Sequence, residues 1–211
     1  LITFLLIFTS LLSAQELKIA VVSDIGGFED GSYNEQIKSA LEEMQSEFSF
    51  ELETKESQLM TEYLNNINQF AEKKFDLIWG IGFTMEQAIR DSAQMYPELN
   101  FAIFDGEVNL ENVLSITFSE EEGAFLAGVI AALESNNSTV AFIGGKENNI
   151  IQSYEAGFNA GVNEVNSEIE VINRYVGSFN NFNQAQEITK ELDEAGADII
   201  FYAAGASAKG I

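Results

Sequence analysis

Short apolar runs alternate along the chain with longer stretches in which apolar residues recur at helical spacing. This alternation is typical of parallel βαβ units, in which buried strands are joined by amphipathic helices. In the first half, strands are expected at residues 17–23, 48–53, 77–81, 101–105 and 113–117. Helices are expected at residues 32–48, 59–74 and 85–96, the last one stopping at Pro97. The pattern predicts one doubly wound α/β domain of about a hundred residues.

The second half repeats this pattern. Strands are expected at residues 139–143, 170–176 and 198–202, and helices at residues 150–163 and 185–195. An earlier helix opens with the capping-box spacing of Ser119 and Glu122, and its residues 124–133 are all apolar or glycine. A helix that is apolar all round is expected to be buried, here against a sheet or a neighbouring domain.

The chain is therefore predicted to form two lobes, residues 17–117 and 118–211. Residues 204–211 have the composition of a further ligand-binding loop, and the helix that should follow it is not there. A small parallel sheet with an exposed edge is an unusual finished unit. We therefore expect the second lobe to be incomplete at its C-terminus.

The loop between the first strand and the first helix is rich in glycine. Gly26, Gly27 and Gly31 allow positive φ and a close approach of the backbone to a ligand. Ser32 and Glu35 have the spacing of a capping box that opens the helix. Open α/β sheets bind small molecules at such corners, outside the carboxyl ends of their strands. We expect a ligand site here.

The charge of this loop favours some ligands over others. No basic residue occurs within residues 19–37, so a phosphate or another anion is disfavoured. Asp24 accepts from N–H or O–H donors, Asn34 both donates and accepts, and Tyr33 offers an aromatic face. Together they favour a planar, neutral, polar ligand. The alternative is that Asp24 and Asp30 only cap or brace the turn.

Composition narrows the classes of function. The 211 residues include 34 acidic and 10 basic ones, for a net charge of −24, with no cluster of Lys and Arg for nucleic acid or an anionic membrane. There is no cysteine and no histidine, so Ser-His-Asp and Cys-His catalysis, Cys/His zinc sites and disulfides are absent from these residues. The acidic pairs indicate a solvated turn or helix start rather than a cation site, so no metal and no cofactor is expected.

The first residues form an apolar run. Residues 1–14 have the length of a signal-peptide core and are too short to span a bilayer. The run begins with Leu1 and lacks a basic segment, so we expect a signal peptide over residues 1–16 whose N-terminus is clipped, with cleavage after Ala14. We infer from this run that the protein is exported. A buried strand or helix is the alternative for this run.

Short motifs follow one another along residues 18–211. They lie at residues 23–34, 80–83, 101–105, 121–128, 142–145, 158–161, 196–201 and 203–205. In this order they resemble the basic membrane protein family, the PnrA-like purine nucleoside substrate-binding proteins of ABC importers. The ordered set is specific, although no single motif is decisive. The resemblance implies the type I periplasmic binding-protein fold, an α/β fold with two Rossmann-like, doubly wound lobes joined by a hinge, of which the second is truncated here.

The resemblance also implies a set of ligand-binding residues. In that family the ligand lies between the lobes, with its base between aromatic rings and its ribose hydroxyls held by carboxylate and Lys side chains. By position, Tyr33 would stack on the base, while Asp24 and Asn34 would bind polar edges. The full expected set is Asp24, Tyr33, Asn34, Gly82, Phe83, Asp105 and Gly205. The alternative for each is a structural role, such as packing on a helix end or capping a turn.

Two departures from the family pattern stand out. Family members often carry a Leu-Ser-x-Cys lipobox, but residues 12–15 read Leu-Ser-Ala-Gln, so a lipid anchor is not supported. Lys209 stands where relatives are often uncharged.

The leading hypothesis is a non-catalytic receptor, exported to the periplasm or cell surface. It would close around a purine nucleoside or a similar small, neutral, polar ligand and deliver it to an ABC permease in the membrane. One alternative is the ligand-sensing ectodomain of a signalling receptor with the same fold. Another is a nucleoside- or nucleotide-using enzyme with a Rossmann-like core, which is disfavoured because Gly26 and Gly27 lack the G-x-G-x-x-G spacing and the local charge opposes pyrophosphate.

Overall fold

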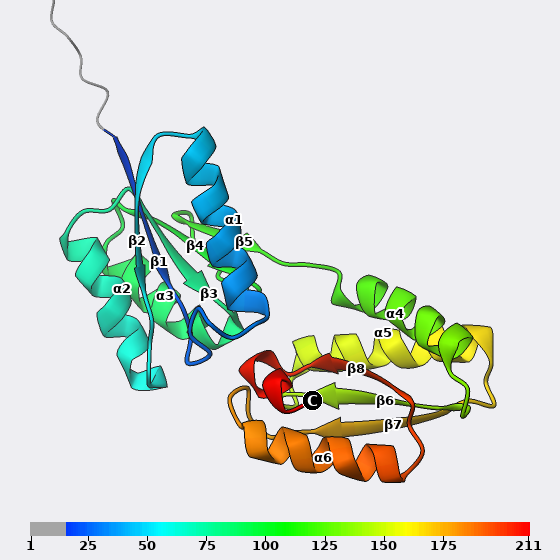
Figure 1. Ribbon diagram of the computed structural model, residues 1–211. Helices are drawn as coiled ribbons and strands as arrows, with labels where there is room; N and C mark the ends of the chain where they lie inside the picture. The colour runs from blue at the N-terminus through cyan, green and yellow to red at the C-terminus, as the bar shows by residue number, and fades with distance from the viewer. Residues whose placement is uncertain (1–15) are drawn as a thin grey trace, which may run out of the picture.

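Two parallel sheets organise the protein (Figure 1). The computed structural model describes residues 16–211, so nearly all of the expected signal peptide lies outside the described residues. The first sheet has five strands in the order β2-β1-β3-β4-β5, and the second has three in the order β7-β6-β8. All strand pairs are parallel. In both sheets the chain starts on an inner strand and winds to either side, which is the doubly wound α/β architecture expected from the sequence.

The five-stranded sheet and its helices form the N-terminal lobe. Its elements are β1 (Leu17–Val22), α1 (Tyr33–Glu47), β2 (Phe50–Lys55), α2 (Tyr63–Glu72), β3 (Leu77–Ile81), α3 (Glu86–Met95), β4 (Asn100–Phe104) and β5 (Val113–Ile116). Helix α1 covers one face of the sheet and α2 with α3 cover the other. The central strands are therefore buried on both sides, which explains why β1 and β3 are almost entirely apolar.

The three-stranded sheet and its helices form the C-terminal lobe. Its elements are α4 (Glu120–Glu134), β6 (Thr139–Gly144), α5 (Asn149–Val165), β7 (Glu170–Tyr175), α6 (Phe182–Glu194), β8 (Ile199–Ala203) and the 3₁₀ helix η3 (Gly205–Gly210). Helices α4 and α5 lie on one face of the sheet and α6 on the other. Residues 117–119 connect the lobes. Between residues 16 and 211, the structure has no helix with the length and apolar character that crossing a membrane requires.

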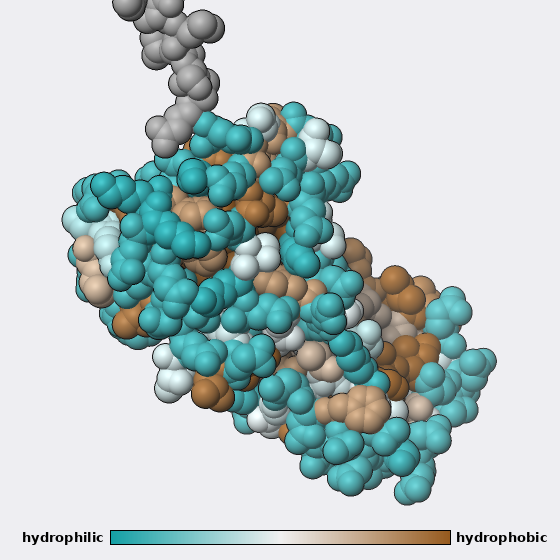
Figure 2. All heavy atoms as spheres, turned by 60° about the vertical axis from the view of Figure 1, so that its left-hand side comes forward, coloured by the Kyte–Doolittle hydropathy of each residue, from teal (hydrophilic) through white to brown (hydrophobic). Residues whose placement is uncertain are grey.

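Helix α4 packs closely on α5, as its small residues suggest. A Cβ at Gly128 would lie 2.1 Å from the carbonyl O of Phe158, so only glycine allows this approach. The expectation that α4 is buried all round is wrong, because its outer face has no neighbour among the described elements: Leu126, Ile130 and Leu133 are each more than 60% exposed. Figure 2 shows apolar side chains gathered on the C-terminal lobe.

The two expected capping boxes do not form. Ser32 and Ser119 stand at the N-caps of α1 and α4, but neither side chain accepts a hydrogen bond from its helix. At α1 the carboxylate of Asp30 does so instead, accepting from the backbone N–H of Ser32 (2.9 Å), Asn34 (3.1 Å) and Glu35 (3.1 Å). A carboxylate offers two charged acceptors and forms stronger bonds than a hydroxyl. The structure thus assigns Asp30 the bracing role that the sequence left as an alternative.

Candidate ligand site between the lobes

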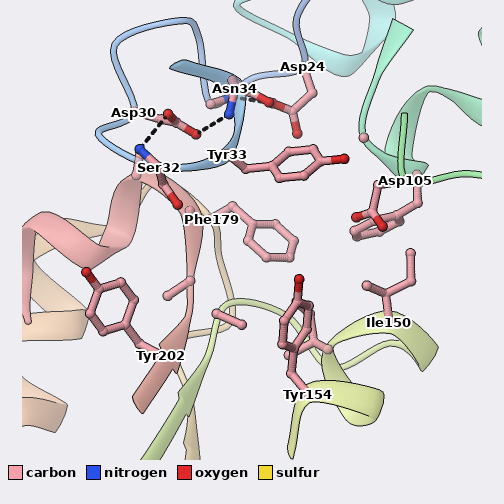
Figure 3. Close-up of a pocket in the computed structure, with 18 of the residues that line it drawn as sticks. Asp24, Asp30, Ser32, Tyr33, Asn34, Asp105, Ile150, Tyr154, Phe179 and Tyr202 are labelled. Atoms are coloured by element: carbon pink, nitrogen blue, oxygen red, sulfur yellow. Dashed lines mark hydrogen bonds between the residues drawn. The ribbon is translucent and has the colours of Figure 1, made fainter. Parts of the chain in front are cut away.

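A cavity of about 210 Å³ lies between the two lobes (Figure 3). Its N-terminal wall comes from the loops after β1, β3 and β4 and from the start of α1. Its C-terminal wall comes from the start of α5, the segment after β7, and the end of β8 with the residues that follow it. Every residue that the sequence predicted around a ligand lines it: Asp24, Tyr33, Asn34, Gly82, Phe83, Asp105 and Gly205. They meet because the carboxyl ends of parallel strands lie at the same edge of each sheet, and the two edges face each other.

Asp24 and Asn34 form the fixed part of the N-terminal wall. The Asp24 Oδ1 atom accepts from the Asn34 Nδ2 atom at 2.8 Å and from the Gly26 N–H at 2.9 Å. Asn34 is 4% exposed and also donates to the Gly27 carbonyl at 3.0 Å, so both of its amide protons are used within the loop. Burial raises the pKa of Asp24, and the hydrogen bonds that it accepts from the Asn34 side chain and the Gly26 N–H oppose this rise. Asn34 therefore holds the loop, while the second oxygen of Asp24 faces Gly82 at the cavity.

Tyr33 and Asp105 lie on the same N-terminal wall as Asp24 and Asn34. Figure 3 shows the Tyr33 ring spanning the cavity with its hydroxyl towards Asp105. That hydroxyl is buried and has no hydrogen-bond partner in the structure. Burial and, next, the nearby carboxylate of Glu120 at the start of α4 together raise the pKa of Asp105 to about 7. The N-terminal wall thus presents a hydroxyl group without a hydrogen-bond partner, close to a carboxyl group that takes up a proton near neutral pH.

Two backbone features shape the same wall. Gly82 has φ +93° and donates from its N–H to the Phe104 carbonyl at 2.9 Å. Asp105 follows β4 in the left-handed region, with φ +59°, and its N–H donates to the Ile116 carbonyl at 2.8 Å. The sequence predicted Asp105 as the last residue of the strand. The left-handed turn instead directs its side chain into the cavity, at the point where β4 and β5 lead towards the C-terminal lobe.

The C-terminal wall is mainly aromatic and apolar, and sequence reasoning missed most of it. Phe179 follows β7, Tyr154 lies on α5, and both rings point towards Tyr33 in Figure 3. Phe179 also packs edge-on against Phe83 of the other lobe, with ring centroids 6.0 Å apart. The signal for Phe179 was available, because its loop follows a predicted strand. Tyr154 lies inside a helix and gave no such signal.

None of the residues lining the cavity is basic, and its charged side chains are carboxylates. Among residues 16–211, no group of three or more His, Cys, Asp or Glu side chains is placed to hold a metal ion. The arrangement can accept hydrogen bonds from a ligand at Asp24 and Asp105 and can enclose a flat ring between aromatic side chains. It suits a molecule with several donors and a planar body.

Comparison with known proteins agrees with this geometry. A family model described as "ABC transporter substrate-binding protein PnrA-like" matches residues 17–211. The chain belongs to this family. Among its PnrA-like relatives, the CD4+ T-cell-stimulating antigen of Listeria monocytogenes is 32% identical over 205 residues, which cover 94% of this chain and 57% of the relative. The ABC transporter nucleoside-binding protein BmpA of Lactococcus lactis is 32% identical over 201 residues, covering 93% and 57%. The chain thus spans little more than half the length of these relatives.

Solved structures show that the PnrA-like chain has the fold of periplasmic solute-binding proteins. An ABC transporter solute-binding protein from Aeropyrum pernix matches with a TM-score of 0.85 at 22% identity, covering 92% of this chain and 56% of the other. A periplasmic solute-binding protein from Actinobacillus succinogenes, solved with bound D-allose, matches with a TM-score of 0.72 at 15% identity, covering 92% and 71%. The type I fold expected from the sequence is confirmed.

Proposed function

We propose that this chain forms the cleft of an exported, non-catalytic receptor that binds a purine nucleoside and delivers it to an ABC permease. The observation that carries the proposal is the cavity itself, where carboxylates of one lobe face aromatic side chains of the other. Nucleosides combine a flat base with several N–H and O–H donors, which these two walls match. Family membership and the name of the Lactococcus lactis relative support the same ligand class.

In this proposal both walls contact the ligand. Tyr33 and Phe179 stack on the base, and Phe83 closes the space between them. Asp24 and Asp105 accept hydrogen bonds from the ligand. Gly82 and Gly205 let the backbone approach it, and Asn34 keeps Asp24 in place. Lobes 17–117 and 118–211 would close by a hinge motion at the segment that connects them.

Calorimetry of the intact protein tests the ligand class. We expect inosine, guanosine or adenosine to bind, and D-ribose to bind far more weakly because it lacks the flat aromatic base that would stack. The Tyr33→Ala variant should lose affinity by about tenfold or more, since stacking on one aromatic side chain contributes roughly 1–3 kcal/mol. Phe48→Ala, at a 59% exposed position outside the cavity, is the matched control and should bind as the wild type does.

Tight binding of a sugar or a peptide with no response to any nucleoside would reject the ligand class. A cell-based measurement separates transport from sensing. Deleting the gene should abolish uptake of radiolabelled nucleoside if the protein serves an importer. Unchanged uptake, with altered expression of other genes in response to the nucleoside, would favour the sensing ectodomain instead.

A further inference from the structure

A hydrogen bond joins the two lobes beside the cavity. Lys209, on η3 of the C-terminal lobe, donates from its Nζ atom to the backbone carbonyl of Glu29 in the glycine-rich loop of the N-terminal lobe. The lysine stem passes over the same loop, since a Cβ at Gly31 would lie 3.6 Å from the Lys209 Cε atom. Lys209 is not among the residues that line the cavity. It therefore reaches the opposite lobe without reaching the ligand site.

The donor end of this bond is held firmly. Ser207, two residues before Lys209, is fully buried, and its hydroxyl accepts from the Asn181 N–H at 2.8 Å and donates to the Ser178 carbonyl at 3.0 Å. A Cβ at Gly210 would come within 2.3 Å of the Phe182 carbonyl. Helix η3 is thus packed tightly on the start of α6. Only the lysine side chain has to be ordered when the bond forms.

The acceptor end is held as well. On one side of Glu29, the Phe28 N–H donates to the Glu56 Oε1 atom at 2.7 Å. On the other side, Asp30 accepts the three α1 bonds described above, and the Gly31 N–H donates to the Glu35 Oε2 atom at 2.9 Å. The Glu29 carbonyl therefore has a fixed position. Because both partners are preorganised, little of the energy of the bond is lost to ordering the backbone.

We propose that Lys209 is a latch across the cleft, which stabilises the closed arrangement of the lobes and slows the release of whatever ligand lies inside. The inference rests on the proposed function, because ligand release is one of its readouts. Lys209 acts on closure rather than on the ligand, so it is a positioning residue that changes release of different ligands by the same factor. The acidic side chains of the loop add attraction to the ammonium group, so the latch should weaken as salt rises.

Ligand dissociation from three variants of the intact protein tests the latch. Lys209→Met keeps the stem and removes the donor, Lys209→Arg restores a donor, and Lys190→Met removes the same charge from α6, away from the cavity. For Lys209→Met, stopped-flow measurements with inosine and guanosine should show dissociation faster by about three- to tenfold for both, with association nearly unchanged. Lys209→Arg and Lys190→Met should resemble the wild type.

A second measurement needs no ligand. The chain has no cysteine, so Glu72→Cys on α2 and Glu164→Cys on α5 can carry spin labels, one on each lobe. We expect Lys209→Met to shift the distances between the labels towards longer values, and Lys190→Met to leave them unchanged.

The two measurements separate the two proposals. If Lys209→Met leaves both the label distances and the dissociation rates at wild-type values, the latch is overturned while nucleoside binding stands. If the wild type binds no nucleoside, the proposed function fails, and the label distances still decide the latch. Dissociation that speeds up for one nucleoside only would also contradict the latch, because it would place Lys209 at the ligand.

Discussion

The two walls of the cavity are built differently. On the N-terminal wall, hydrogen bonds among Asp24, Asp30, Asn34 and the backbone hold the glycine-rich loop in place without a ligand. On the C-terminal wall, Phe179 and Tyr154 stand among apolar neighbours and offer mainly ring surface. The first wall can fix the orientation of a ligand by hydrogen bonds, and the second adds contact area when the lobes close. Loss of either wall should therefore weaken binding, but by different mechanisms.

The largest expected effect comes from the acceptor of the N-terminal wall. Asp24→Ala removes an acceptor for the ligand and also the partner of Asn34 and Gly26. We expect nucleoside affinity to fall by about a hundredfold, or about 3 kcal/mol, since bonds to charged groups are the stronger ones. Calorimetry measures this loss. Asp91→Ala, at a partly exposed carboxylate on α3 outside the cavity, is the control, and equal losses in both variants would contradict the role of Asp24.

The C-terminal wall should give a smaller effect on the same assay. Phe179→Ala removes ring surface but no hydrogen bond from its side chain, so we expect affinity to fall by roughly 1–2 kcal/mol, in the range of one base–aromatic stack. Phe179→Tyr should keep most of it. Wild-type affinity in Phe179→Ala would show that Phe179 does not stack on the base.

A variant at Asn34 tests how the loop is held in place, separately from ligand binding. Asn34→Ala deletes two partly buried hydrogen bonds and leaves the Gly27 carbonyl without its donor, which should lower the free energy of unfolding by about 1–3 kcal/mol. Chemical denaturation followed by the fluorescence of Trp79, in the core of the N-terminal lobe, measures this change. Asn65→Ala, on α2, is a matched control that should change stability little. If Asn34→Ala is as stable as the control, the loop is held by other contacts.

The smallest effect concerns the carboxyl group of Asp105. Its pKa is raised from 3.8 to about 7, so the folded state binds more protons than the unfolded state between about pH 4 and pH 7. Stability should therefore fall as pH rises through this window. After allowance for solvent screening, Asp105→Asn should be more stable than the wild type by about 1 kcal/mol at pH 8, and the difference should vanish near pH 4. Thermal unfolding across this pH range checks the expectation, which fails if the difference does not depend on pH.

The sequence predicted the N-terminal wall better than the C-terminal wall, and the reason is physical. Glycines, acidic residues and a strand end lie close together in residues 23–34, so local rules indicate a site there. Tyr154 reaches the cavity only because α5 packs beside α4, through Gly128 and Gly161, and packing between helices is not readable from local spacing. The strand and helix order was predicted because burial on both faces gives β1, β3 and β6 continuous apolar runs.

Two local expectations failed because tertiary context decided them. The capping boxes at Ser32 and Ser119 have the right spacing, but at α1 the better acceptor Asp30 takes the helix N–H groups. Residues 124–133 are apolar on every side, yet the outer face of α4 is exposed. Spacing indicates which bonds and contacts are possible, and the neighbouring elements determine which of them form.

Hydrogen exchange of the intact protein, with and without a saturating nucleoside, tests the central claim most directly. If the ligand lies between the two walls, exchange should slow together in residues 23–34 of the N-terminal lobe and in residues 177–183 and 203–210 of the C-terminal lobe. Slower exchange confined to one lobe, or located on the outer face of either lobe, would contradict binding in the cleft.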